Sequence, residues 1–222
     1  MGERFVILFH PSCLKLMMFK KSHHYPLLIV ITGLLSIFAC IGIGRFTLGM
    51  ILPSMSSSLK LNYSMMGMIS AGNFSGYLGS VISCSLILNF ITPRLLICLG
   101  LFLISSCMIL VSFAESYISV VILYTITGIG SGAVNVPVMS LVNRWFVPEY
   151  RGKAAGFMAI GSGFAIMLSG WMIPFINNIY ADLGWRISWK LSSLIVFLSA
   201  IAAGLFIRNT PEDIGIKPYG EK

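Results

Sequence analysis

Charged residues are scarce in this chain of 222 amino acids: Lys, Arg, Asp and Glu make up 10% of it, against roughly 25% in soluble domains. So few charges do not cover the surface of a soluble globular protein, which argues strongly against a soluble enzyme. Hydrophobic residues supply 57% of the sequence. This excludes a disordered chain, because disorder requires low hydrophobicity and high charge. The composition indicates an integral membrane protein.

Residues that perform chemistry are scarce as well. The three histidines, His10, His23 and His24, all precede the first long apolar run, so a membrane serine protease would lack a base near its serine. The five cysteines are scattered without a CxxC spacing, which supports neither a metal site nor a disulfide framework. We expect no catalytic residue, no metal and no cofactor, and we do not expect an enzyme.

Basic residues give the chain a net charge of +8, yet they form no stripe or basic–aromatic array, so no nucleic-acid partner is predicted. They lie in short segments between apolar runs. If the N-terminus is cytoplasmic, eleven Lys and Arg residues fall in inside segments and three in outside segments. Positive residues favour the cytoplasmic side. We therefore expect both termini in the cytoplasm, with the chain in a bacterial inner membrane.

Six apolar runs are each long enough to cross a bilayer core, which needs about 20 residues per helix. The runs are Pro26–Leu52, Tyr63–Phe90, Pro93–Ala114, Tyr117–Val142, Ala154–Ile179 and Ile187–Ile207. Barrel strands would be short and alternating, so helices are predicted. The expected fold is an all-α, integral membrane six-helix bundle in contact with lipid.

The sequence also contains an internal repeat. Gly42-Ile43-Gly44 in the first run returns 86 residues later as Gly128-Ile129-Gly130 in the fourth. The glycine pair Gly67 and Gly72 of the second run returns 89 residues later as Gly156 and Gly161 in the fifth. Three helices per copy invert the second copy in the membrane, as in transporter halves. We predict two inverted three-helix repeats.

Glycines at helical spacing predict close helix packing. Gly72 and Gly76 lie four residues apart on one face, as do Gly128 and Gly132, and small residues let membrane helices approach closely. A hinge or a close backbone approach to substrate is the alternative role. Pro137, inside the fourth run, is expected to kink its helix.

Arg45 is the sharpest single candidate, because it lies about seven residues, or ~10 Å of helix, from the end of its run at Leu52. An arginine at such depth is costly and usually faces a cavity. It is either a positive anchor for an anionic substrate such as a carboxylate, or a side chain that reaches the interface or a backbone carbonyl. Both interpretations are open at this point.

Further polar residues lie within the apolar runs. Tyr124, Ser131 and Asn135 share one face of the fourth helix, at i, i+7 and i+11. They are candidate substrate-pathway residues, and hydrogen bonds that only join helices are the alternative. The same two roles are open for two residues of the second run, Asn73 and Tyr77. None of the seven acids lies deep in a run, so a carboxylate for proton coupling would come from elsewhere.

The stretch Arg144–Gly156, RWFVPEYRGKAAG, follows a helix that contains GIGSG and Pro137. It resembles the loop between helices four and five of the major facilitator superfamily. The tail PEDIGIKP, residues 211–218, resembles the stretch after helix six in the monocarboxylate and oxalate–formate exchanger branches and in related uncharacterised bacterial ones. The resemblance covers roughly residues 26–220 and corresponds to the N-terminal six-helix half of a twelve-helix carrier.

This resemblance implies secondary transport of a small solute by alternating access, with a second six-helix half as partner, from the same chain family or from a homodimer. It also implies a gating role for four residues at the loops: Arg94, Arg144, Arg151 and Gly152. The chain departs from the family in three places, one of which is the fifth-helix Gly-Pro antiporter motif, absent from this sequence. Between helices two and three only Arg94 of the charged motif is present, and Tyr124 stands where the family has an arginine.

The expected organisation is an N-terminal cytoplasmic or interfacial arm over 1–25, the bundle over 26–207 and a cytoplasmic tail over 208–222 that begins a central linker. The alternative functions are a truncated non-transporting half or a regulatory membrane protein. A channel is less favoured, because no filter-like loop or acidic ring is present. An anionic substrate rests on Arg45 alone, and neither the substrate nor a coupling ion is specified by the sequence.

Overall fold

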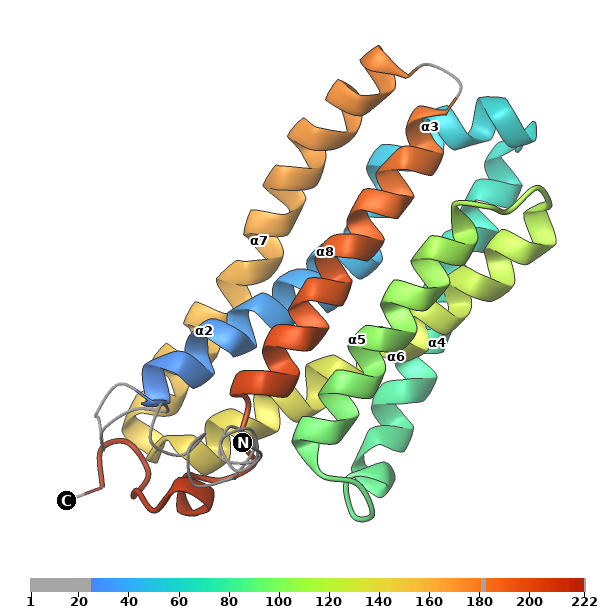
Figure 1. Cartoon of the computed structure of the whole chain (residues 1–222). Coiled ribbons are helices and arrows are strands. Elements are labelled where there is room, and N and C mark those ends of the chain that lie inside the picture. The colour runs from blue at the N-terminus through green and yellow to red at the C-terminus, as the bar shows by residue number, and fades with distance from the viewer. Residues whose placement is uncertain (1–24, 181–182, 222) are drawn as a thin grey trace, which may run out of the picture.

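A computed structural model describes residues 25–180 and 183–221, so the predicted arm over 1–25 lies outside the described residues except for Tyr25. Helices supply the regular structure of this part of the chain (Figure 1). The helices are α2 (Tyr25–Ile37), η2 (Phe38–Phe46), α3 (Thr47–Leu59), α4 (Tyr63–Ile87), α5 (Pro93–Val111), α6 (Tyr117–Trp145), α7 (Pro148–Ile179), α8 (Gly184–Phe206) and the short η3 (Pro211–Ile214).

The first three elements are consecutive and make one rod from Tyr25 to Leu59, so α2 to α8 form six rods. Within the described residues, five rods are both long and apolar enough to cross a membrane, and α4 is not among them. At 25 residues α4 has the length, but it carries six serines, four glycines and Asn73. The all-α bundle is confirmed, and its six-helix count is approximate because α4 lacks the long apolar stretch that each of the other five rods contains.

Two predicted helix boundaries were wrong by more than three residues. The first rod continues through Pro53 to Leu59 and ends where Lys60 adopts a left-handed conformation, with φ of 51°. The fifth helix begins at Pro148 rather than Ala154, because proline suits the first position of a helix, where no N–H is needed. Arg151 and Gly152 therefore lie on the first turns of α7 and not in a loop.

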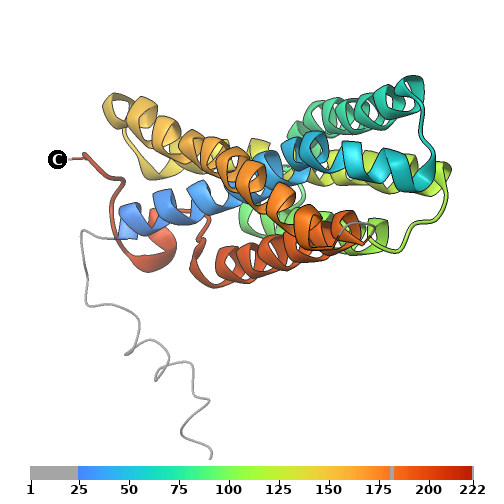
Figure 2. The same ribbon diagram turned by 90° about the horizontal axis from the view of Figure 1, so that it is seen from above.

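The helices pack in two groups (Figures 1 and 2). α6 lies against α4 and α5, while α7 lies against η2 and α2, and α5 lies along α8. Gly128 of α6 faces the backbone of Asn73 in α4, as Gly42 of η2 faces the backbone of Ser162 in α7. The spacings of 86 and 89 residues relate these two crossings. The repeated glycines of the sequence therefore lie at corresponding helix crossings in the structure.

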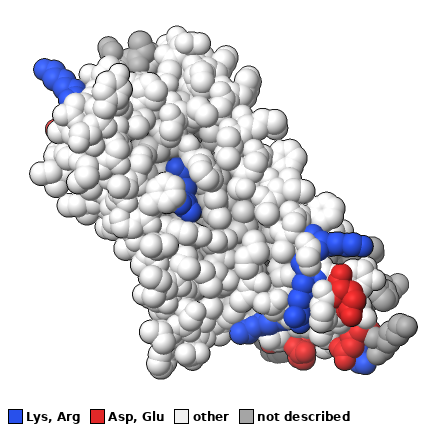
Figure 3. All heavy atoms as spheres, turned by 180° about the vertical axis from the view of Figure 1, so that it is seen from behind, with Lys and Arg blue, Asp and Glu red and all other residues white. Residues whose placement is uncertain are grey.

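Charged side chains gather at one end of the bundle (Figure 3). This basic end is where α5 and α7 begin and where α6 and α8 end. Its described cations are Arg94, Arg144, Arg151, Lys153, Arg208 and Lys217. The cations at the opposite end, where α4, α6 and α8 begin, are Lys60, Arg186 and Lys190. The uneven distribution matches the one predicted from the sequence.

The tail after α8 folds back onto the start of α7. The Tyr219 N–H donates to the carbonyl of Trp145 (2.8 Å), and the Val147 N–H donates to the carbonyl of Tyr219 (3.2 Å). The Tyr219 ring packs edge-on against Tyr150, with 5.1 Å between centroids. The Trp145 indole N–H donates to the carbonyl of Arg208 (3.2 Å). The predicted tail is thus an ordered segment that joins the ends of α6 and α8 to α7.

The glycine crossing of α4 and α6 generates a stability prediction. In Gly128→Ala the added Cβ meets the carbonyl oxygen of Asn73, so the helices must move apart. We expect the free energy of unfolding to fall by about 1–3 kcal/mol, measured by SDS titration in mixed micelles. Gly156→Ala is the control, because its Cβ enters open space; an equal loss in both variants would contradict the crossing.

Candidate functional site

The centre of the first rod is a π-helix, Phe38–Phe46, between two α-helical segments. A π-helix bonds residue i to i+5 and often occurs at functional sites. Two hydroxyls of α6 bond to carbonyls of this segment. The Ser131 hydroxyl donates to Cys40 (2.8 Å), and the Tyr124 hydroxyl donates to Arg45 (2.8 Å).

The Arg45 side chain leaves the π-helix between two aromatic rings of α4. Its guanidinium carbon lies 4.4 Å from the centre of the Phe74 ring and 4.1 Å from that of Tyr77. Stacked aromatic faces attract a guanidinium and hold its plane. The Arg45 Nε is buried and has no hydrogen-bond partner among the described residues. Its charge is therefore held by rings, with no carboxylate among the neighbours that the structure describes.

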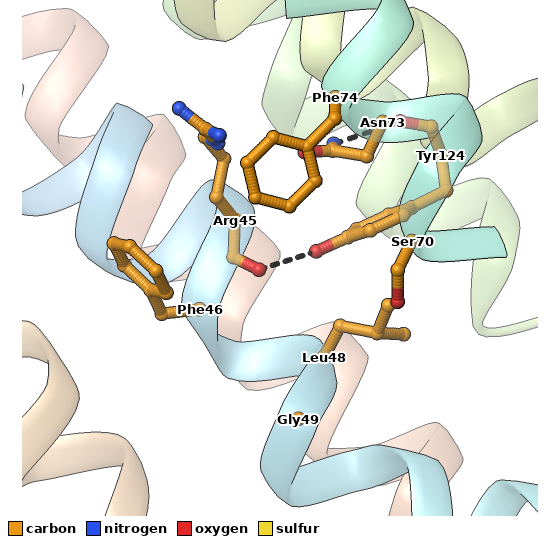
Figure 4. A pocket seen from close by; sticks show the side chains of 8 residues that line it. All are labelled: Arg45, Phe46, Leu48, Gly49, Ser70, Asn73, Phe74 and Tyr124. Atoms are coloured by element: carbon orange, nitrogen blue, oxygen red, sulfur yellow. Dashed lines mark hydrogen bonds between the residues drawn. The ribbon is translucent and has the colours of Figure 1, made fainter. Parts of the chain in front are cut away.

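A cavity of about 190 Å³ lies beside Arg45, between the first rod, α4 and α6 (Figure 4). Polar groups from three rods meet at its wall. Its lining residues are Arg45, Phe46, Leu48, Gly49, Ser70, Asn73, Phe74 and Tyr124. A second hollow, of about 530 Å³, lies between the ends of α3 and α4 and shares Gly49 with the first. The two hollows together extend from Arg45 to the opposite end of the bundle.

All six candidate pathway residues fall in one contact network. The Asn73 side-chain amide donates to the carbonyl of Tyr124 (2.9 Å), whose hydroxyl reaches Arg45. The Asn135 amide donates to the Tyr77 hydroxyl (2.8 Å), and the Tyr77 ring lies against the guanidinium. Ser131 bonds to the same π-helix one turn away. Of the six, Arg45, Asn73 and Tyr124 line the cavity itself.

The residues predicted to gate lie at the basic end, away from this network. The Arg94 guanidinium donates to the carbonyl of Gly204 in α8. Arg151 donates to the carbonyls of Phe146 (3.0 Å) and Asn143 (3.1 Å), so it caps the end of α6. Arg144 and Gly152 are exposed. These contacts place Arg94 and Arg151 as ties between helix ends, and a gating role stays a prediction.

The predicted packing glycines lie at helix crossings. Gly72 and Gly76 both face Thr125 of α6, and Gly132 faces Ser80 of α4. Gly128 occupies the crossing with Asn73 described above. Pro137 is buried inside α6, which continues through it. Small residues thus bring α4 and α6 together beside the cavity.

Sequence reasoning missed Phe74, Gly49 and the π-helix. Phe74 is one more aromatic residue in an apolar run, and its only signal is that it precedes Tyr77 by three residues, on the same helix face. Gly49 follows Arg45 by four residues, and its added Cβ would meet open space. The π-helix has no clear sequence signal beyond the close pair Gly42 and Gly44.

A sequence model of the Major Facilitator Superfamily matches residues 34–222. The chain belongs to the major facilitator superfamily. This membership, the apolar helices and the all-helical fold make it an integral membrane protein of a transporter family, and not an enzyme.

Two curated relatives of this major facilitator chain are transporters. The "Hexuronate transporter" of Bacillus subtilis (strain 168) is 25% identical over 103 residues, which are 46% of this chain and 24% of the relative. The "Oxalate:formate antiporter" of Oxalobacter formigenes is 34% identical over 86 residues, or 39% of this chain and 20% of the relative. Each aligned segment is a quarter or less of the relative's length.

Solved structures share the fold. A bacterial homologue of the human lysosomal transporter Spinster, inward-facing and unoccupied, superposes with a TM-score of 0.73 at 16% identity, over 90% of this chain and 46% of that one. The inward-facing occupied form gives a TM-score of 0.67 at 16% identity, over 86% and 46%. The major facilitator chain described here spans about half the length of these transporters.

Gly49 lines both hollows, which predicts water access at this residue. In a variant without native cysteines, Gly49→Cys should react about tenfold faster with a charged maleimide than Leu198→Cys, because the reactive thiolate forms in water and not in lipid. Leu198 is a matched control, since it is 56% exposed on the apolar surface of α8. Equal labelling rates at the two positions would show that the hollow is closed to water.

Proposed function

We propose that this chain forms the N-terminal six-helix half of a secondary transporter for a small anionic solute, and that Arg45 anchors the anion. Alternating access rocks one unit against another around a central site, so the proposal includes a second six-helix half. The observation that carries it is the Arg45 guanidinium, beside a cavity, between two rings and without a described acidic neighbour.

The energetics of an isolated charge favour an anionic ligand. Arg45 lies in the middle of the longest rod, and an arginine at the centre of a membrane helix costs ~3 kcal/mol or more to insert. Aromatic faces compensate part of this cost, but they do not neutralise the charge. A carboxylate bound at the N–H edge of the guanidinium would neutralise it and accept two hydrogen bonds.

The relatives support the same chemistry. Hexuronate, oxalate and formate, the solutes in the names of the two curated relatives, are all carboxylates. The contact network supports pathway roles for Asn73, Tyr77, Tyr124, Ser131 and Asn135. In this proposal they orient Arg45 against the rings of Phe74 and Tyr77, which together form an aromatic clamp, and Asn73 adds a polar wall.

The basic end supports a cytoplasmic location for both ends of the bundle. It carries six described cations, against three at the opposite end, and positive residues favour the cytoplasmic side. We place the chain in a bacterial inner membrane with the basic end inside. In this orientation the residues over 208–222 begin the linker to the second half, and Arg94 and Arg151 tie the helix ends that must move together.

Binding by the purified chain in lipid nanodiscs tests Arg45. Oxalate and formate are the probes, and isothermal titration calorimetry is the measurement. For whichever of the two anions binds, we expect Arg45→Gln to raise the dissociation constant by about tenfold or more. This is the effect of losing a hydrogen bond to a charged group. Arg45→Lys keeps the charge without the planar fork and should bind with intermediate affinity.

Arg186→Gln is the matched control, because Arg186 also stacks on an aromatic ring, that of Trp185 at 4.3 Å, but lies at a helix end outside the cavity. It should bind the anion as the unaltered chain does. The proposal is wrong if Arg45→Gln binds with unchanged affinity, if no anion binds, or if a neutral sugar binds equally well.

A further inference from the structure

The site contains a feature that anion binding alone does not explain: two α6 hydroxyls donate hydrogen bonds to backbone carbonyls of the π-helix. Several buried serines and threonines in this bundle bond to the carbonyl four residues earlier in their own helix, as Thr127 does to Leu123 (3.0 Å). Ser131 makes this bond to Thr127 (3.0 Å) and also reaches across to Cys40 of the first rod (2.8 Å), while the Tyr124 hydroxyl reaches across to Arg45.

The spacing of these bonds matches the π-helical register. Cys40 and Arg45 are five residues apart, which is the i to i+5 step of a π-helix. Tyr124 and Ser131 are seven residues apart, which is two turns of an α-helix and keeps both on one face. One straight face of α6 therefore contacts two carbonyls that are separated by one hydrogen-bond step of the π-helix.

The donors themselves are held firmly. Tyr124 is 1% exposed and Ser131 is fully buried. The Tyr124 ring packs edge-on against Trp189 of α8 at 5.8 Å, and the Asn73 amide holds its backbone carbonyl. A Cβ at Gly44 would lie 3.2 Å from the Ser131 hydroxyl, so α6 and the π-helix are in direct contact here.

The register decides where Arg45 points. Each residue of an α-helix turns the chain by about 100°, and a π-helix turns less per residue, because its hydrogen-bonded step is longer. A change of Phe38–Phe46 to α-helix would therefore rotate Arg45 around the rod, away from Phe74 and Tyr77. The aromatic clamp engages the guanidinium only in the π-helical register.

We propose that Tyr124 and Ser131 are positioning residues that hold the π-helical register and thereby aim Arg45 at the cavity. The predicted effect of these residues on anion affinity rests on the function proposed above, because both concern the same site. It assigns Ser131 an effect on anion binding although Ser131 does not line the cavity. It also explains why a tyrosine at 124 is useful: its ring packs against α8 while its hydroxyl reaches the first rod.

The test uses Tyr124→Phe and Ser131→Ala, which each remove one hydroxyl and keep most of the packing. Each should weaken anion binding about three- to tenfold in the calorimetric assay, the order of one net hydrogen bond. Thr127→Val is the matched control, because Thr127 is an equally buried α6 residue whose hydroxyl bonds within its own helix. It should bind the anion as the unaltered chain does.

A second measurement needs no ligand. The chain has seven arginines, so ¹⁵Nε-arginine labelling gives a short NMR spectrum in which Arg45→Lys identifies the Arg45 resonance. Without anion, that resonance should shift in Tyr124→Phe and in Ser131→Ala, while the other resonances and the Thr127→Val spectrum stay unchanged. A shift of one resonance reports reorientation of Arg45, and a general loss of structure would move them all.

The two measurements separate the two proposals. If no anion binds, or if Arg45→Gln binds normally, the proposed function is wrong, and the ligand-free spectra still decide whether the hydroxyls position Arg45. If both hydroxyl variants keep the Arg45 resonance of the unaltered chain, the positioning role is wrong. Weaker anion binding with an unshifted Arg45 resonance also overturns it, because the hydroxyls would then act without reorienting the guanidinium.

Discussion

The structure depends on close backbone contact between α6 and its neighbours. Lipid tails are as apolar as leucine, so no hydrophobic force drives membrane helices together, and small residues that permit tight packing take over this role. Residues 128–132 of α6 face three different elements: Gly128 and Gly132 lie against α4, Gly130 against α5, and Ser131 against η2. A five-residue stretch of one helix thus sets the spacing of three others.

The same contacts create the site. Because α4 and the first rod are both held close to α6, Arg45 from one meets Phe74 and Tyr77 from the other above Tyr124. A guanidinium in lipid would be unfavourable, and one buried against leucines would lose its polar partners. The arrangement gives it two π-faces and a hollow. The same residues of α4 and α6 therefore determine both how the helices pack and where the charge of Arg45 lies.

Much of the fold was predictable because its signals are periodic or compositional. Run length predicted the helices, and the glycine repeat predicted which crossings are equivalent. The shared polar face of Tyr124, Ser131 and Asn135 indicated a functional face on α6, which the structure places beside Arg45. The π-helix could not be predicted, because the hydroxyls that bond to its carbonyls lie 79 and 91 residues away in the sequence. Phe74 was missed because a cation–π contact requires knowing which rod faces which. The start of α7 was missed because a charged segment that contains a proline is typical of a loop. Here Pro148 instead occupies the first position of the helix.

The folded tail has a consequence for how this membrane bundle responds to its aqueous surroundings. Bonds from 207–221 reach the start of α5 through Asn209 (3.0 Å to the Arg94 N–H), the end of α6 through Arg208 and the start of α7 through Tyr219. These hydrogen bonds lie at the charged end of the bundle, outside the hydrocarbon. Urea and proteases act there, because neither enters the hydrocarbon. Part of what holds the bundle together therefore responds to the aqueous solution at this end rather than to the lipid, as the packing of a soluble protein does.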